Sequence, residues 1–119
     1  MVLMTREEHY HLMNDIWNKV CDTRAAGQNE YAADEENVFA NFERTSKSLN
    51  LSKEQVLWVF LMKHIDGISS YLKGHKSQRE DVTGRITDAI VYLCLLWGMI
   101  EDKKPKRKLG FWESKNGVK

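Results

Sequence analysis

Four polar residues recur at helical spacing where the chain enters its most apolar stretch. They are Asp81, Arg85, Asp88 and Tyr92, at positions i, i+4, i+7 and i+11, which share one face of a helix. The stripe runs into twelve uncharged residues, 89–100, which predict a helix that is buried on most sides. An unpaired charge in such surroundings is costly, so these groups must be paired or used. The stripe is therefore the best candidate for a functional site.

Further candidates lie on two other predicted helices. His64 falls within an apolar arc and Lys63 lies at its edge, while Glu35 shares a helical face with Phe39 and Phe42. If these helices pack together, the cations would hold phosphates, the carboxylates would hold Mg²⁺, and the histidine and tyrosine would orient the ligand. The candidate ligand-binding residues are Lys63, His64, Arg85, Asp88 and Tyr92, and the candidate metal ligands are Glu35 and Asp88.

Simpler interpretations of the same residues stay open. A lone histidine on an apolar face is more often a core residue with one hydrogen bond than a ligand or base. Glu35 can serve only to stabilise the positive end of a helix dipole. Asp81, Arg85 and Asp88 can form a structural network of salt bridges. Spacing fixes the face of each helix but not which faces meet.

Helix start signals and breakers predict an all-α, four-helix bundle-like single domain. Capping boxes begin at Thr5, Ser52 and Ser77, Asp34 is a further plausible cap, and no alternating strand pattern occurs. We expect helices over about 6–24, 35–48, 53–73 and 78–102, with a break at residues 27–29 after the first. The helical domain is predicted to occupy residues 1–102, followed by a basic C-terminal tail, residues 103–119.

Apolar spacing also predicts which side chains are buried. The first helix should bury Met13, Ile16, Trp17 and Val20, and the second should present Val38, Phe39, Phe42 and Leu49 to the core. Cys21 and Cys94 both lie on apolar stretches and belong to no CxxC pair, so we expect two buried, reduced thiols.

Two helices are more apolar than a small monomer requires. Residues 56–62, VLWVFLM, are apolar around nearly two turns, and the last helix adds a stripe of small residues that permits close helix approach. The stripe comprises Gly84, Thr87, Val91, Cys94 and Gly98. This excess of apolar surface favours a homodimer or larger assembly. The alternative is a monomeric bundle whose own loops cover the excess.

The charge is divided unevenly along the chain. Residues 103–119 hold seven lysines and arginines against one glutamate, a net charge of +6 that leaves −5 on the rest. With Phe111 and Trp112 the tail has the composition of a nucleic-acid-binding segment, but a solvated extension whose two aromatics dock on its own bundle or a neighbour fits better, since no basic face continues into the body. Charge near the N-terminus predicts no signal peptide, and the twelve-residue apolar run is too short to span a bilayer. We therefore expect a cytoplasmic protein.

Three segments of the chain resemble a family of small helical proteins encoded mainly by bacteriophages. They are NEYAADEENVFANFERTSKSL, FLMKHIDGIS and RITDAIVYLCLLWGMIED. The pattern is similar to that of the nucleotide-modification-associated domain 1 type and covers about residues 30–102. Its matching positions here are Tyr31, Asn41, Phe42, Lys63, His64, Asp88 and Tyr92. Where the family has serine after the Lys-His pair, this chain has Gly67.

That family is in turn distantly similar to the all-α nucleoside triphosphate pyrophosphohydrolases, including MazG-like enzymes and dimeric dUTPases. The resemblance implies a nucleotide ligand and Mg²⁺ held by an EExxE and an ExxD motif. This chain departs from both, because Asp34-Glu35-Glu36 leads to Phe39 and Arg85 precedes Asp88. We therefore expect a nucleotide-binding or nucleotide-processing protein, with non-catalytic sequestration of a nucleotide signal or inhibition of a host protein as the first alternative. Nucleic-acid binding through the tail is the second.

Overall fold

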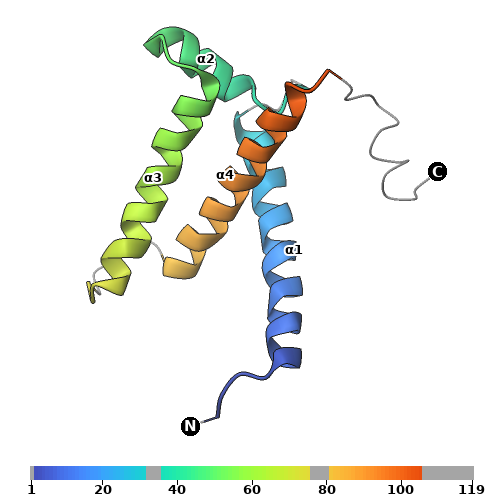
Figure 1. Cartoon of the computed structure of the whole chain (residues 1–119), viewed down its shortest axis with the longest axis vertical. Coiled ribbons are helices and arrows are strands. Elements are labelled where there is room, and N and C mark those ends of the chain that lie inside the picture. Colours follow the sequence, from blue (N-terminus) through green and yellow to red (C-terminus); the bar gives the residue numbers. More distant parts are fainter. Residues whose placement is uncertain (1, 32–35, 76–80, 106–119) are drawn as a thin grey trace, which may run out of the picture.

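The computed structural model describes residues 2–31, 36–75 and 81–105 of the 119-residue chain. Within these ranges it contains four helices and no strand (Figure 1). The helices are α1 (Arg6–Tyr31), α2 (Ala40–Leu49), α3 (Lys53–Leu72) and α4 (Val82–Asp102). The predicted all-α class is confirmed, and the arrangement is consistent with a four-helix bundle.

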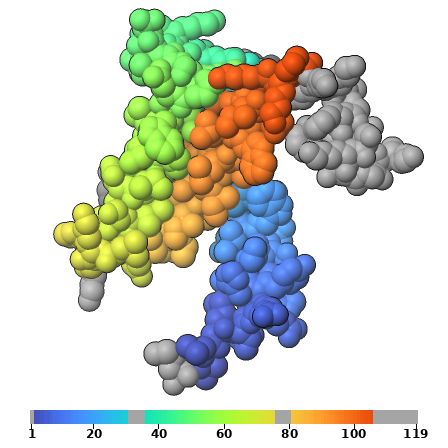
Figure 2. All heavy atoms as spheres, viewed as in Figure 1, coloured from blue at the N-terminus to red at the C-terminus, as the bar shows by residue number. Residues whose placement is uncertain are grey.

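The central helix of the fold is α4, which packs against both α1 and α3. α3 and α4 run antiparallel as a long hairpin, and the short α2 packs on α3 at the end away from the hairpin connection (Figure 1). α1 lies along α4, and its N-terminal half projects away from the other helices (Figure 2). The fold is therefore an α3–α4 hairpin with α1 attached to one side of it.

The hydrophobic core lies where α2 meets the first turns of α3 and the last turns of α4. Its buried cluster comprises Phe39, Phe42, Val56, Leu57 and Met99, with Tyr92, Leu95 and Leu96 packed against it. Leu57 and Met99 have no exposed surface. The core is small, so each of its side chains carries a large share of the stability.

Two of the predicted capping boxes are present. Glu8 N donates to Thr5 Oγ1 at 3.1 Å and Thr5 N donates to Glu8 Oε1 at 2.9 Å. The same reciprocal pair joins Ser52 and Gln55 at the start of α3, with distances of 3.1 and 2.9 Å. These bonds satisfy backbone donors that a helix N-terminus leaves free. The caps expected at Ser77 and Asp34 lie outside the described residues.

The Lys103 ammonium ties the end of α4 to the start of α3 through the Glu54 carboxylate. This contact holds the pKa of Glu54 below its ordinary value of 4.5. A depressed carboxyl pKa adds stability that is complete above the unfolded-state value and is lost as the pH falls through the folded-state value. Wild type should therefore lose unfolding free energy as the pH falls below 4.5. We expect Lys103→Met to lose less than wild type over the same pH range, by about 1 kcal/mol or less. Urea unfolding across that pH range, with the exposed Lys47→Met as control, measures the difference; parallel curves for Lys103→Met and wild type would contradict it.

The expected break in the first helix is wrong, because α1 continues through residues 27–29 to Tyr31. A glycine inside a helix costs only about 1 kcal/mol relative to alanine, so tertiary packing overrides it readily. Packing against α4 supports this part of α1, and Arg24 Nη2 donates to Gln28 Oε1 at 2.6 Å across the glycine. Gly27 therefore weakens the helix by less than the contacts of this segment stabilise it.

Two other helices start later than expected, whereas α3 agrees with its prediction to within one residue. α2 begins at Ala40 rather than near residue 35, because Phe39 N donates to Asn37 Oδ1 at 2.9 Å in a turn that competes with helix. α4 begins at Val82, preceded by Asp81, whose carboxylate accepts a 2.7 Å hydrogen bond from Thr83 Oγ1.

Several side chains predicted to be buried are exposed. Among the described residues of α1 only Val20 is buried; Met13 and Trp17 are about half exposed, because Met13 lies in the projecting half of α1 and Trp17 borders an open groove between α1 and α4. Val38 and Leu49 beside α2 are exposed as well, whereas Phe39 and Phe42 are buried as expected. The uncharged part of α4 likewise keeps a wide exposed face, because α1 and α3 cover only part of its circumference.

The small-residue stripe of α4 contributes to the side that faces α1. Val91, Cys94 and Gly98 line a groove of about 520 Å³ together with Trp17 and Val20 of α1. A Cβ on Gly98 would lie 3.2 Å from the Phe39 ring, so glycine permits a close approach there. The expectation that this stripe admits another helix in close approach stays a prediction, because the near neighbour of Gly98 is the Phe39 ring and a Cβ on Gly84 would meet open space.

The prediction that both thiols are buried is wrong. Cys21 and Cys94 are free and exposed, and both line the α1–α4 groove. We expect both to react in the folded protein with a chromogenic disulfide such as dithiobis-nitrobenzoate, with the single variants Cys21→Ser and Cys94→Ser each releasing half the signal. Protection of either thiol until denaturant is added would contradict the exposed placement.

α4 meets the length and composition of a membrane-crossing helix, although its uncharged run is only twelve residues long. Its most apolar window has a mean hydropathy of 1.3, and 17% of that window is buried inside the chain. Core helices of soluble proteins can have the same length and apolar composition, so these two properties do not establish where the protein resides.

Candidate functional site

A cavity of about 630 Å³ lies between all four helices and collects most of the predicted site residues. Its polar lining consists of Thr23, Arg24, Gln28 and Glu30 from α1, Asn41 and Thr45 from α2, Lys63 and His64 from α3, and Asp88 and Tyr92 from α4. The assumption that the separate polar faces meet is therefore correct for Lys63, His64, Asp88 and Tyr92.

The α3–α4 packing brings His64 against two residues of the polar stripe. His64 is 5% exposed, and its Nδ1 lies 3.7 Å from Asp88 Oδ2. Its ring lies beside that of Tyr92, with centroids 5.5 Å apart and planes tilted by 31°. Asp88 thus lies within ion-pair distance of the buried imidazole and on the side of its Nδ1 atom, although 3.7 Å is too long for a hydrogen bond.

Aromatic side chains connect this group to the hydrophobic core. The Phe42 ring meets Tyr92 edge-on at a centroid distance of 6.2 Å and meets Phe60 at 6.1 Å. Phe42 belongs to the buried core cluster, so one side of the cavity rests on rigidly packed residues. Flat aromatic surface beside charged groups suits a ligand that has both a ring and an anionic part.

Arg24 is the charged cavity residue of most interest among the lining residues that sequence reasoning missed, which also include Thr23, Gln28, Glu30 and Thr45. Its Nη2 donates to Gln28 Oε1 at 2.6 Å and to the Val38 carbonyl oxygen at 3.3 Å, so the guanidinium is held between α1 and the residues before α2. Burial lowers the pKa of Arg24 from its ordinary value, yet an arginine stays charged at neutral pH. The i, i+4 pairing with Gln28 was a usable signal, hidden by the expectation that the helix ends at residue 24.

Arg85 does not line this cavity, although it shares the helical face of Asp88 and Tyr92. Its side chain lies in the space above Gly67 of α3, where a Cβ would come within 2.5 Å of Arg85 Cδ and Nη1. Its Nε is buried and has no hydrogen-bond partner among the described residues. Gly67 therefore makes room for this arginine, which is a physical reason for glycine at a position where the resembling family has serine.

The alternative of a salt-bridge network along the stripe is not what the structure contains. Asp81 accepts a hydrogen bond from Thr83, which lowers the pKa of its carboxyl group. Asp88 lies against His64. No ion pair joins Arg85 to either carboxylate. The stripe therefore divides into a cavity part, Asp88 and Tyr92, and a packing part, Arg85.

The carboxylates that the structure describes do not assemble a metal cage. Asp88 and Glu30 line the cavity, but no group of three or more His, Cys, Asp or Glu side chains within residues 2–31, 36–75 and 81–105 is placed to hold a metal ion. Glu35, the other predicted ligand, lies outside the described residues. The described residues thus do not fit the four-carboxylate Mg²⁺ arrangement that the resemblance implies.

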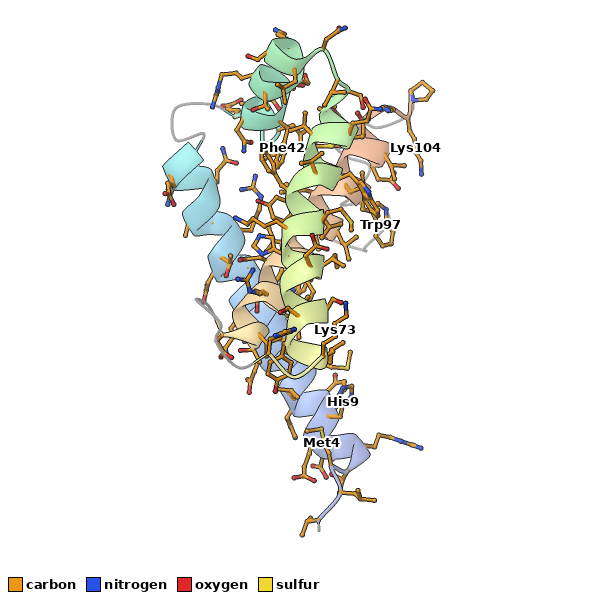
Figure 3. All side chains as sticks on the ribbon, turned by 90° about the vertical axis from the view of Figure 1, so that its left-hand side faces the viewer. Met4, His9, Phe42, Lys73, Trp97 and Lys104 are labelled. Atoms are coloured by element: carbon orange, nitrogen blue, oxygen red, sulfur yellow. The ribbon has the colours of Figure 1, made fainter. Side chains whose placement is uncertain are left out.

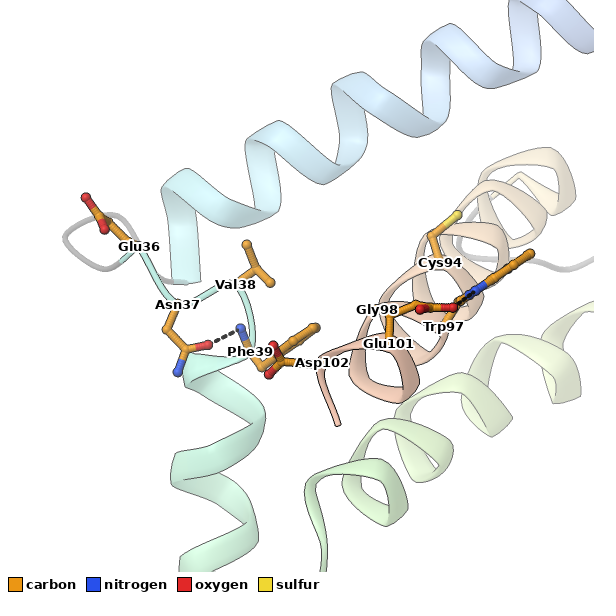
Figure 4. A pocket seen from close by; sticks show the side chains of 9 residues that line it. All are labelled: Glu36, Asn37, Val38, Phe39, Cys94, Trp97, Gly98, Glu101 and Asp102. Atoms are coloured by element: carbon orange, nitrogen blue, oxygen red, sulfur yellow. Dashed lines mark hydrogen bonds between the residues drawn. The ribbon is translucent and has the colours of Figure 1, made fainter. Parts of the chain in front are cut away.

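A second cavity of about 620 Å³ lies at the other side of the residues that precede α2 (Figure 4). Its charged lining residues are all acidic: Glu36, Glu101 and Asp102. Trp97 Nε1 donates to Glu101 Oε1 at 3.2 Å, and Lys104 also pairs with that carboxylate. A lining without a cation does not suit a phosphate, so this cavity is the weaker candidate for an anionic ligand.

Only the first residues of the predicted basic tail belong to the described part of the chain. Lys103 and Lys104 pair with Glu54 and Glu101, so both are engaged by the helical domain. Residues 106–119, with both aromatics of the tail, lie outside the described residues. Nucleic-acid binding through residues 103–119 stays a prediction.

No protein-family model, curated protein or solved structure matches this chain. The resemblance to the phage-encoded family and to MazG-like enzymes therefore stays a prediction.

Proposed function

We propose that this protein binds a nucleotide in the four-helix cavity. The observation that carries the proposal is the convergence of two cations, Arg24 and Lys63, with the His64–Tyr92 ring pair in one cavity of about 630 Å³. That volume lies within the range of roughly 300–1,000 Å³ typical of small-molecule sites. The resemblance of the sequence to the phage-encoded helical family predicts the same class of ligand.

The two cations have different tasks in the proposed complex. Arg24 is half-buried and oriented by Gln28 and the Val38 carbonyl, so its guanidinium presents a fixed fork to two phosphate oxygens. Lys63 is exposed at the rim, where a point charge on a long side chain attracts the anion without fixing its geometry. Arg24 should therefore contribute most of the phosphate affinity and Lys63 part of the association rate.

The aromatic side of the cavity would hold the base. Tyr92 and His64 offer ring surface for stacking, and Asn41, Thr45 and Gln28 offer donors and acceptors for the base edge and the sugar. Asp88 would keep the imidazole in one orientation, which makes it a positioning residue. The predicted ligand-binding role of Arg85 is not part of this proposal, because Arg85 lies outside the cavity lining.

Binding without turnover is favoured over hydrolysis. The described carboxylates form no Mg²⁺ cage, so Mg²⁺ would enter only as a companion of the phosphates; Asp88 and Glu35 stay its predicted ligands, and Glu35 lies outside the described residues. Such a protein would sequester a nucleotide or carry it as a signal. A pyrophosphohydrolase remains the alternative function.

Mass spectrometry of a panel of linear and cyclic nucleotides, incubated with the protein in Mg²⁺ and in EDTA, tests the proposal. We expect one nucleotide to be retained intact in the protein-bound fraction, with EDTA reducing retention less than tenfold. Conversion of a triphosphate to its monophosphate in Mg²⁺ alone would replace sequestration by hydrolysis. A panel left wholly unbound and unchanged would overturn the proposed function.

A further inference from the structure

The α3–α4 hairpin carries two rows of large apolar side chains that the described part of the chain leaves exposed. On α3 the row has a spacing of seven residues, and on α4 it has the same spacing with one additional tryptophan. The rows are Trp58, Ile65 and Leu72 on α3, and Ile86, Leu93, Trp97 and Ile100 on α4; these seven residues are named the hairpin face. Their exposed fractions run from 39% for Ile65 to 76% for Leu72.

The hairpin face lies on the side of the hairpin opposite to the cavity and to α1. On α3, Ile65 lies two residues after Lys63 of the cavity, hence about 200° around the helix. On α4, Leu93 lies two residues after Val91 of the α1 groove, again about 200° around. Ile65 and Leu93 therefore both lie away from the cavity and from the α1 groove. Figure 3 shows Trp97 directed away from α1.

Spacing, charge and area indicate what covers this face. A seven-residue repeat of apolar residues on two adjacent helices is the pattern that packs onto further helices. No charged residue belongs to the two rows. Their exposed side-chain fractions amount to roughly 700 Å² of apolar area, close to the roughly 800 Å² that each partner buries in a stable complex.

The carboxylates that border the face, Glu54 and Glu101, are paired with Lys103 and Lys104, so this border adds no net charge to a contact. A second copy brings an identical uncharged face, so the contact places no unpaired charge between the subunits.

We propose that two copies pack their hairpin faces together about a two-fold axis, so that two α3–α4 hairpins form a four-helix bundle. Such a contact is self-complementary, because each subunit contributes the same rows. The cavity stays open on the outer side of each subunit. The proposal does not rest on nucleotide binding, and either can fail without the other.

Sedimentation equilibrium of the full chain and of Leu93→Asp tests the proposal. We expect wild type at twice the 13.9 kDa chain mass and Leu93→Asp at 13.9 kDa with an unchanged helical circular dichroism spectrum. Val59→Asp is the matched control, because Val59 is an exposed apolar residue of α3 outside the hairpin face, and it should stay dimeric. A monomeric wild type, or a dimeric and folded Leu93→Asp, would overturn the proposal.

Cross-linking keeps the proposal testable if the charged variant unfolds. In a Cys21→Ser, Cys94→Ser background, Ile65→Cys and Leu93→Cys lie midway along the rows, near the proposed two-fold axis. At least one should form a covalent dimer under mild oxidation, whereas Val59→Cys should not. Equal cross-linking at all three positions would contradict the assigned face. Flotation of a monomeric wild type with anionic phospholipid vesicles would assign the face to a membrane instead.

Discussion

Replacing Arg24 with glutamine should weaken binding of the nucleotide retained in the panel by 10- to 100-fold. A hydrogen bond from a charged group to a ligand contributes about 1.5–3 kcal/mol, and Arg24 is half-buried and held in place by Gln28 and the Val38 carbonyl. Isothermal titration calorimetry at fixed ionic strength measures the loss. Lys63→Gln, which removes an exposed cation at the rim, should cost less than tenfold and should act mainly on the association rate.

Two companion variants distinguish a binding role from a structural one. Arg24→Lys keeps the charge but loses the fork, so it should recover only part of the affinity. Lys47→Gln removes an exposed cation of α2 outside the cavity lining and should leave the affinity unchanged. An Arg24→Gln protein that binds as tightly as wild type, with the same melting temperature, would remove Arg24 from the site.

Replacing Leu57 with alanine should lower the free energy of unfolding by about 3 kcal/mol, within the range of 2–5 kcal/mol for large-to-small core substitutions. Leu57 has no exposed surface and belongs to a core cluster of five residues. Urea denaturation at one protein concentration gives the difference and avoids the effect of subunit association on apparent stability.

The matched control for Leu57 is Val59 on the same helix. Val59 is 60% exposed, so Val59→Ala should change the unfolding free energy by less than about 0.5 kcal/mol. Similar losses for the two variants would mean that the core does not lie where α2, α3 and α4 meet. A large loss for Val59 alone would place that residue in an additional interface.

Local sequence signals, such as helix caps and apolar spacing, predicted a helix correctly where the tertiary contacts favour the same boundaries. α3 begins at its capping box, Ser52 and Gln55, and its length is correct to one residue because cap and apolar arc coincide. α1 shows the opposite case, in which a glycine predicted an end that contacts with α4 and the Arg24–Gln28 bond override. Exposure was predicted least well, since Trp17 is apolar and in register but borders an open groove between α1 and α4 and stays about half exposed.

The sequence predicted which helical faces form the candidate site, but not which residues line it. Helical spacing placed Asp88 and Tyr92 on one face, and His64 in an apolar arc, and the structure brings these three together. Spacing also assigned Arg85 to the site, but the missing side chain of Gly67 lets that arginine pack against α3 instead. Arg24 was missed, because the expected end of the first helix at residue 24 hid its i, i+4 pairing with Gln28, and because its place in the cavity depends on how α1 crosses the other helices.

The N-terminal half of α1 has a consequence for how the chain unfolds. Residues 6–15 are exposed, and their local support is the Thr5–Glu8 cap and the Glu7–His11 pair at 3.7 Å. A helical segment of this length is marginal in water without tertiary contacts. Its amide protons should therefore exchange through local opening, long before those of α4 exchange through global opening. The chain thus has two cooperative units of unequal stability, and slower exchange in residues 6–15 would report any partner that comes to rest on them.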